Sequence, residues 1–88
     1  YWRAYNNLAW SLATNPKVRD GSRAIEFARK ASELSRLEDP NILDTLAAAH
    51  AAAGDFEKAI EIQLQAVELV PEELKAAYRL RVELYRTR

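Results

Sequence analysis

Apolar residues recur every three or four positions along most of the chain, and this spacing predicts helices rather than strands. The predicted helices cover about residues 2–14, 20–36, 40–53, 55–70 and 71–86. The links between them are short, as is usual between helices that pack side by side. We therefore predict an all-α chain.

Residues that end or begin helices stand at the expected boundaries. Gly54 is placed to end the third helix, because glycine takes the left-handed conformation without a clash at Cβ. Asp55 can accept hydrogen bonds from the free N–H groups of the fourth helix, and either Asp20 or Ser22 can do so for the second. Further boundary signals are Asn15-Pro16 after the first helix, Asp39 with Pro40 at the start of the third, and Pro71 at the start of the last.

Each predicted helix has an apolar stripe that we expect to pack inward. The expected inner faces are Tyr5, Leu8, Ala9 and Leu12 in the first helix; Ala24, Ile25, Ala28, Ala31 and Leu34 in the second; and Ala77, Leu80 and Leu84 in the last. The other sides of the last helix are polar, which is typical of a helix that covers the end of a helical array.

The segment from Pro40 to Glu73 has a turn between two helices and small residues where those helices would touch. The positions that matter are Leu43, Leu46, Ala47, His50, Gly54, Asp55, Phe56, Ala59, Ala66 and Pro71. In these positions, and in its length of about 34 residues, the segment resembles a tetratricopeptide repeat. His50 and Gln63 depart from the pattern, since the family usually has an aromatic residue at both positions.

The resemblance implies a right-handed superhelix of two helix-turn-helix hairpins and a C-terminal capping helix. The first hairpin, about residues 2–36, looks like a degenerate copy of the second, residues 40–73, with a longer turn; the capping helix is about 71–86. The set also resembles the C-terminal modules of large bacterial proteins. We expect one domain, 1–88, cut from a longer protein, because the chain begins at Tyr1 rather than Met.

Composition narrows the possible partners. Lys plus Arg equals Asp plus Glu at 13 each, so no net charge attracts the chain to nucleic acid or to a membrane surface. No apolar run approaches the ~20 residues that a membrane span needs. The chain has no cysteine, which leaves the compartment open; a cytoplasmic location is slightly favoured.

The sequence offers little for catalysis. It has one histidine, no cysteine, no glycine-rich phosphate loop and no His-Glu metal spacing, so we expect neither an enzyme nor a cofactor or metal site. His50 stands among alanines and is interpreted as a packing residue or a residue at the edge of a groove. Neighbouring carboxylates such as Glu57 and Glu61 are expected to be solvated.

Binding of a partner protein or peptide is the favoured function. In the family that the chain resembles, the first helix of each hairpin lines a concave face that accepts a partner segment. Trp10 would be a large rigid anchor, and the asparagines can pair with a peptide backbone. Carried over to this chain, the partner-binding residues are Arg3, Asn6 and Trp10; Asn41 and Asp44; and Lys75, Tyr78 and Arg79, with Thr14, Ala48 and Ala52 beside them.

Of three alternatives, only the first stays open. The segment is a structural cap of a longer solenoid, with self-association through the N-terminal face formed by Tyr1, Trp2 and Tyr5; or it clamps a C-terminal carboxylate through Lys75 and Arg79; or it binds RNA. The clamp is only half present, and no basic stripe follows the first helices, so we predict neither carboxylate-tail nor nucleic-acid binding.

Overall fold

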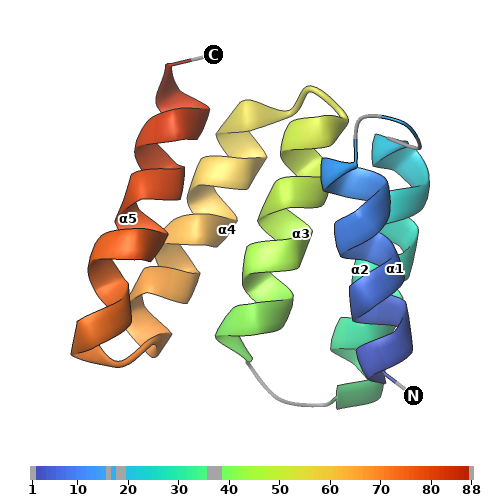
Figure 1. Cartoon of the computed structure of the whole chain (residues 1–88), viewed down its shortest axis with the longest axis horizontal. Coiled ribbons are helices and arrows are strands. Elements are labelled where there is room, and N and C mark those ends of the chain that lie inside the picture. The colour runs from blue at the N-terminus through green and yellow to red at the C-terminus, as the bar shows by residue number, and fades with distance from the viewer. Residues whose placement is uncertain (1, 16, 18–19, 36–38, 88) are drawn as a thin grey trace.

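The computed structural model describes residues 2–15, 17, 20–35 and 39–87. Within them the chain forms five helices, α1 (Trp2–Thr14), α2 (Gly21–Ser35), α3 (Pro40–Ala52), α4 (Phe56–Leu69) and α5 (Glu72–Arg86) (Figure 1). The prediction of an all-α chain is confirmed, and the helices lie close to their predicted ranges. The proposed end of the second helix, Arg36, lies outside the described residues.

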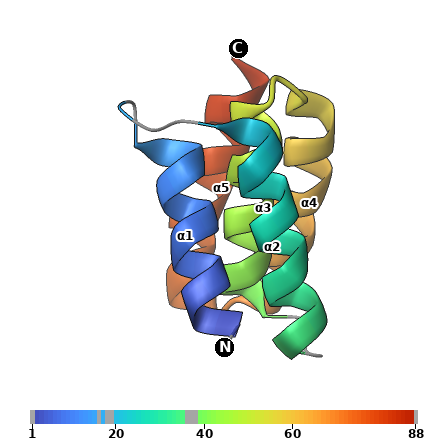
Figure 2. The same cartoon turned by 90° about the vertical axis from the view of Figure 1, so that its right-hand side faces the viewer.

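The helices pack as neighbours in chain order. Contacts join α1 to α2, α2 to α3, α3 to α4 and α4 to α5, and α1 also packs against α3. Figure 2 shows α1 and α5 toward one side of the array and α2 and α4 toward the other. In Figure 1, α5 is the outermost helix at one end, with α4 as its neighbour.

Local capping explains where α2, α3 and α4 begin. The Asp39 carboxylate accepts from the Asn41 backbone N–H at 2.9 Å, and the Asp55 carboxylate accepts from the Lys58 N–H at 3.1 Å. Of the two candidates for α2, Asp20 is the cap, since its carboxylate accepts from the Arg23 N–H at 3.1 Å. Gly54 has φ +90°, the left-handed conformation that its position after α3 requires.

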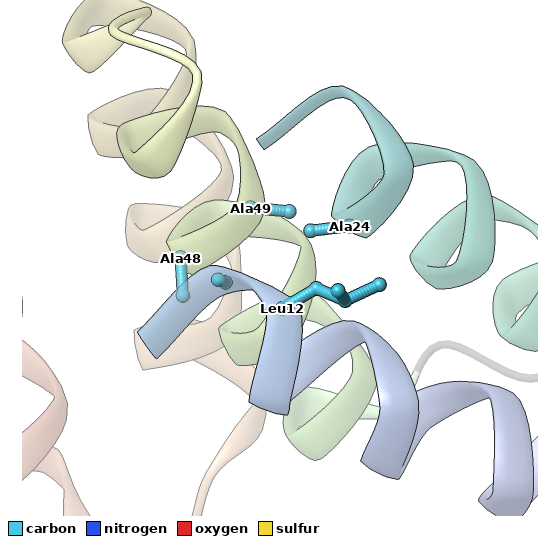
Figure 3. Packing of buried hydrophobic residues seen from close by; sticks show 5 residues of the cluster. Leu12, Ala24, Ala48 and Ala49 are labelled. Carbon is cyan, nitrogen blue, oxygen red and sulfur yellow. The ribbon is translucent and has the colours of Figure 1, made fainter. Parts of the chain in front are cut away.

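The core is built largely from alanine. Side chains of one carbon let helix backbones approach closely, and Figure 3 shows Leu12, Ala24, Ala48 and Ala49 meeting where α1, α2 and α3 converge. A second cluster joins α4 to α5 through Ala66, Val67, Val70, Tyr78 and Val82. The alanines with no exposed surface are Ala9, Ala24, Ala28, Ala31, Ala47, Ala49, Ala59 and Ala66.

Part of the predicted inner face is wrong. Leu8 and Leu34 are more than two-fifths exposed, because the alanines beside them make the close contacts between helices. In α5 the error covers the whole stripe. Ala77, Leu80 and Leu84 are exposed, whereas Tyr78 and Val82, on the opposite side of the helix, pack against α4.

Candidate functional site

Two cavities follow one another along a single face of α3. The first, of about 430 Å³, is polar and is lined by Arg3, Asn6, Asn7, Trp10, Asp39, Asn41, Asp44 and Thr45. The second, of about 240 Å³, is lined by Ala13, Thr14, Ala48, Ala51, Ala52, Phe56, Leu84 and Tyr85. Residues 44, 48 and 52 are one helical turn apart, so both cavities lie on the same side of α3. We call the two together the α3 groove.

The structure brings most of the predicted binding residues to the α3 groove. Arg3, Asn6 and Trp10 from α1 face Asn41 and Asp44 from α3 across the polar cavity. Tyr78 reaches the same place from α5, since its hydroxyl donates to the Asn41 side-chain oxygen at 3.4 Å. Thr14, Ala48 and Ala52 line the second cavity.

Lys75 and Arg79, two further predicted binding residues, lie outside the α3 groove. The Lys75 ammonium donates to the Val67 carbonyl oxygen at 2.6 Å and so covers the end of α4. Arg79 lines a different cavity, between α4 and α5. Successive helix residues are about 100° apart, so Arg79 points well away from Tyr78 and from the groove.

Arg81 contacts three residues of the groove region and was not among the predicted binding residues. Its guanidinium forms an ion pair and a hydrogen bond with the Asp44 carboxylate. The guanidinium carbon also lies 5.5 Å from the centre of the Trp10 ring and 5.7 Å from the centre of the Tyr78 ring. Three helices therefore meet through this side chain. Its position three residues after Tyr78, on the same side of α5, was the available signal.

Asp44 also holds a buried partner from α4. The Gln63 amide N–H donates to the Asp44 carboxylate at 3.0 Å, and Gln63 is fully buried. Gln63 stands where the resemblance led us to expect an aromatic residue, and a hydrogen bond to a buried carboxylate gives the amide a structural role there. Asp44 thus accepts from α4 and from α5 while it belongs to α3.

The surroundings of Asp44 shift the pKa values of three neighbouring side chains. Burial lowers the pKa of Arg81, but its hydrogen bond to Asp44 and the charge of Asp44 outweigh burial, and the net pKa is raised. Burial raises the pKa of Tyr78 and of Tyr85, and the nearby Asp44 charge raises both further. All three groups therefore stay protonated at neutral pH, with Asp44 the negative centre.

One acceptor in the groove wall has no donor. The side-chain oxygen of Asn6 is buried and pairs with no group in the described part of the chain. A buried acceptor of this kind gains free energy from any donor that reaches it. The residue itself lines the polar cavity, as Trp10 does.

The described residues include no group of three or more His, Asp or Glu side chains placed to hold a metal ion. His50 is buried at the end of α3, where its carbonyl oxygen accepts from the Asp55 N–H at 2.9 Å. Burial lowers the pKa of its imidazole. Its contacts suit packing of the hairpin turn.

Comparison of the chain with models of protein families, with curated proteins and with solved structures found no match. Across the described residues, none of the helices has the length and apolar character required to cross a membrane.

Proposed function

We propose that the chain is a protein-interaction module similar to tetratricopeptide repeats, which binds a segment of a partner protein in the α3 groove. The observation that carries the proposal is the convergence of α1, α3 and α5 on one groove that has a polar and an apolar part. Trp10 supplies exposed aromatic surface, and Asn6 and Asn41 supply amide groups. The right-handed superhelical arrangement expected from the sequence belongs to the same proposal.

The two parts of the groove fit different parts of a peptide. The polar part offers acceptors and donors that can pair with a main chain or with polar side chains. The alanine-lined part offers apolar surface from Phe56, Leu84 and Tyr85 to an apolar side chain. Binding sites commonly combine an apolar wall with a few placed polar groups.

The test is a selection of peptides from a random display library on the immobilised chain. Selected peptides are then titrated against the wild type and an Asn6→Ala/Trp10→Ala variant. A Lys30→Ala/Glu33→Ala variant is the matched control, since both residues are exposed on α2. Circular dichroism checks that all three proteins are equally helical.

We expect the groove variant to bind selected peptides about tenfold or more weakly, a loss of about 1.4 kcal/mol, while the control binds as the wild type does. The same variant used as bait in a lysate of the source organism should lose the natural partner. Peptides bound equally by the groove variant and the wild type, or no selected peptide at all, would overturn the proposal and leave the segment as a structural cap.

A further inference from the structure

The side chain of Arg81 occupies a site that three helices build. Its guanidinium pairs with the Asp44 carboxylate of α3. The guanidinium carbon lies 5.5 Å from the centre of the Trp10 ring of α1 and 5.7 Å from the centre of the Tyr78 ring of α5. A carboxylate beside aromatic rings suits a planar cation, because the charge pairs with the carboxylate while the flat group packs on the rings. We call Asp44, Trp10 and Tyr78 the guanidinium site.

Two walls of the guanidinium site are held more firmly than its occupant. Asp44 is 8% exposed and accepts from the buried Gln63 amide, and Tyr78 is also 8% exposed and packs against α4. By contrast, 37% of the Arg81 side chain is exposed to solvent. A long side chain that already reaches the surface can turn into water, where its N–H groups are hydrated. Arg81 is therefore an exchangeable occupant of a fixed site.

The guanidinium site adjoins the space where a partner segment is proposed to lie. Asp44 and Trp10 belong to the site and also line the polar cavity of about 430 Å³. Asn6 and Asn41 line the same cavity and offer amide groups to a main chain. A segment held there by its main chain has its side chains within reach of Asp44 and Trp10.

We propose that the guanidinium site takes an arginine side chain of the partner segment, which displaces Arg81. This inference rests on the function proposed for the α3 groove and specifies its ligand. Arg81 then acts as a built-in competitor. The site is open only in the fraction of molecules whose Arg81 points into solvent, and the apparent affinity for the partner is reduced by that fraction. Arginine suits the site better than lysine, because a guanidinium is planar and lies flat on aromatic rings.

The charges at the site favour a basic partner residue over an acidic one. Asp44 is the counter-charge of Arg81, so the guanidinium has its carboxylate already. A partner carboxylate in place of Arg81 would face the buried carboxylate of Asp44, and like charges at short range repel strongly where water is excluded. A partner guanidinium instead restores the ion pair that Arg81 gives up.

The first experiment needs no partner protein. Arg81→Ala empties the guanidinium site, and N-acetyl-arginine amide, whose only charge is its guanidinium, is titrated into that variant between about 1 and 100 mM at constant ionic strength. In a Trp2→Phe background, we expect this compound to lower the acrylamide quenching of Trp10 and to raise the melting temperature. N-acetyl-citrulline amide, which has a similar shape and no charge, should do neither. Arg81→Gln replaces the alanine variant if circular dichroism shows the alanine variant to be unfolded.

The second experiment tests the exchange during partner binding. Peptides selected from the display library are titrated against the wild type, Arg81→Ala and Arg29→Ala, which removes an exposed arginine of α2 as the matched control. We expect the peptides to contain an arginine and to bind Arg81→Ala about tenfold more tightly than the wild type, as a site open in about one molecule in ten requires. Replacing that peptide arginine with citrulline should weaken binding to Arg81→Ala about tenfold or more. Arg29→Ala should bind as the wild type does.

Quenching of Trp10 and a melting temperature that N-acetyl-arginine amide leaves unchanged overturn the guanidinium site. Selected peptides that need no arginine, or that bind Arg81→Ala no more tightly than the wild type, overturn the exchange. In both cases the function proposed for the α3 groove still stands or falls by its own test, which uses variants of α1. A selection that gives no peptide overturns the proposed function, and the arginine partner is overturned with it.

Discussion

The backbone of Gly21, at the start of α2, lies directly against the backbone of Ala53, at the end of α3. A Cβ atom added to Gly21 would lie 2.4 Å from the Ala53 nitrogen and 2.6 Å from its Cα. Both distances are far below van der Waals contact, and the obstructing atoms belong to a backbone held by the Gly54 turn. This close approach joins the first hairpin to the second.

Replacing Gly21 with alanine should therefore destabilise the whole array. The added methyl group must push α2 away from the end of α3, which we expect to cost about 3 kcal/mol, the upper part of the range for overpacked sites. For a chain of this size, that cost corresponds to a melting temperature lower by about 12–24 °C. Thermal denaturation followed by circular dichroism measures it. A melting temperature equal to that of the wild type would show that α2 can move away from the end of α3 without a loss of stability.

Gly54→Ala is the contrasting substitution. Space is open around Gly54, but its φ of +90° is a conformation that residues with a side chain rarely adopt. We expect a cost of about 1–2 kcal/mol from backbone strain alone. Urea denaturation should place this variant between the wild type and Gly21→Ala. A larger loss at Gly54 than at Gly21 would contradict the packing argument.

Helix ends could be predicted from the sequence, because the signals that set them are local. Asp39, Asp55 and Gly54 act through backbone groups within a few residues, and each acts in the structure as predicted. A reader of the sequence needs no knowledge of the neighbouring helices to find them.

The faces of the helices were harder to predict, because they depend on neighbours. In α5, the stripe of Leu80 and Leu84 and the stripe of Tyr78 and Val82 both have helical spacing, and only packing on α4 decides between them. Arg79 was expected at the binding face from the family resemblance, whereas Arg81 makes the contacts with Asp44 and with the Trp10 and Tyr78 rings. The contact of Gly21 with Ala53 involves residues far apart in sequence, and no local pattern near Gly21 predicts it.

The buried carboxylate of Asp44 should matter far more for stability than exposed ion pairs do. Asp44→Ala leaves the buried Gln63 amide with only its longer hydrogen bond to the Tyr78 carbonyl oxygen and leaves Arg81 without its counter-charge, which we expect to cost about 2–3 kcal/mol. Glu83→Ala removes the exposed pair with Arg86, whose atoms lie 3.4 Å apart, and should cost less than about 0.5 kcal/mol. Chemical denaturation of both variants makes the comparison. Equal losses would show that the Asp44 network is not a stabilising centre.

Arg81 should shield the Trp10 ring from solvent, and fluorescence quenching can measure this shielding. Arg81→Gln removes the guanidinium from the Trp10 and Tyr78 rings, and the freed indole should become more exposed to solvent. We expect acrylamide to quench Trp10 emission more strongly in this variant, measured in a Trp2→Phe background. Quenching identical to that of the same background with Arg81 intact would place Trp10 outside the contact.

Stability should fall in mildly acidic solution because of His50. Burial lowers its pKa, and of the charged groups around it, Arg29 and Lys58 lower the pKa while Asp55 raises it. The folded chain therefore binds a proton less readily than the unfolded chain, whose histidine titrates at about pH 6.5. The stabilisation is complete above that pH and declines as the pH falls below it toward the folded pKa. His50→Phe, which removes the titrating imidazole, should flatten the change in unfolding free energy between pH 7.5 and 5.5. An unchanged slope in the variant would remove His50 as the cause.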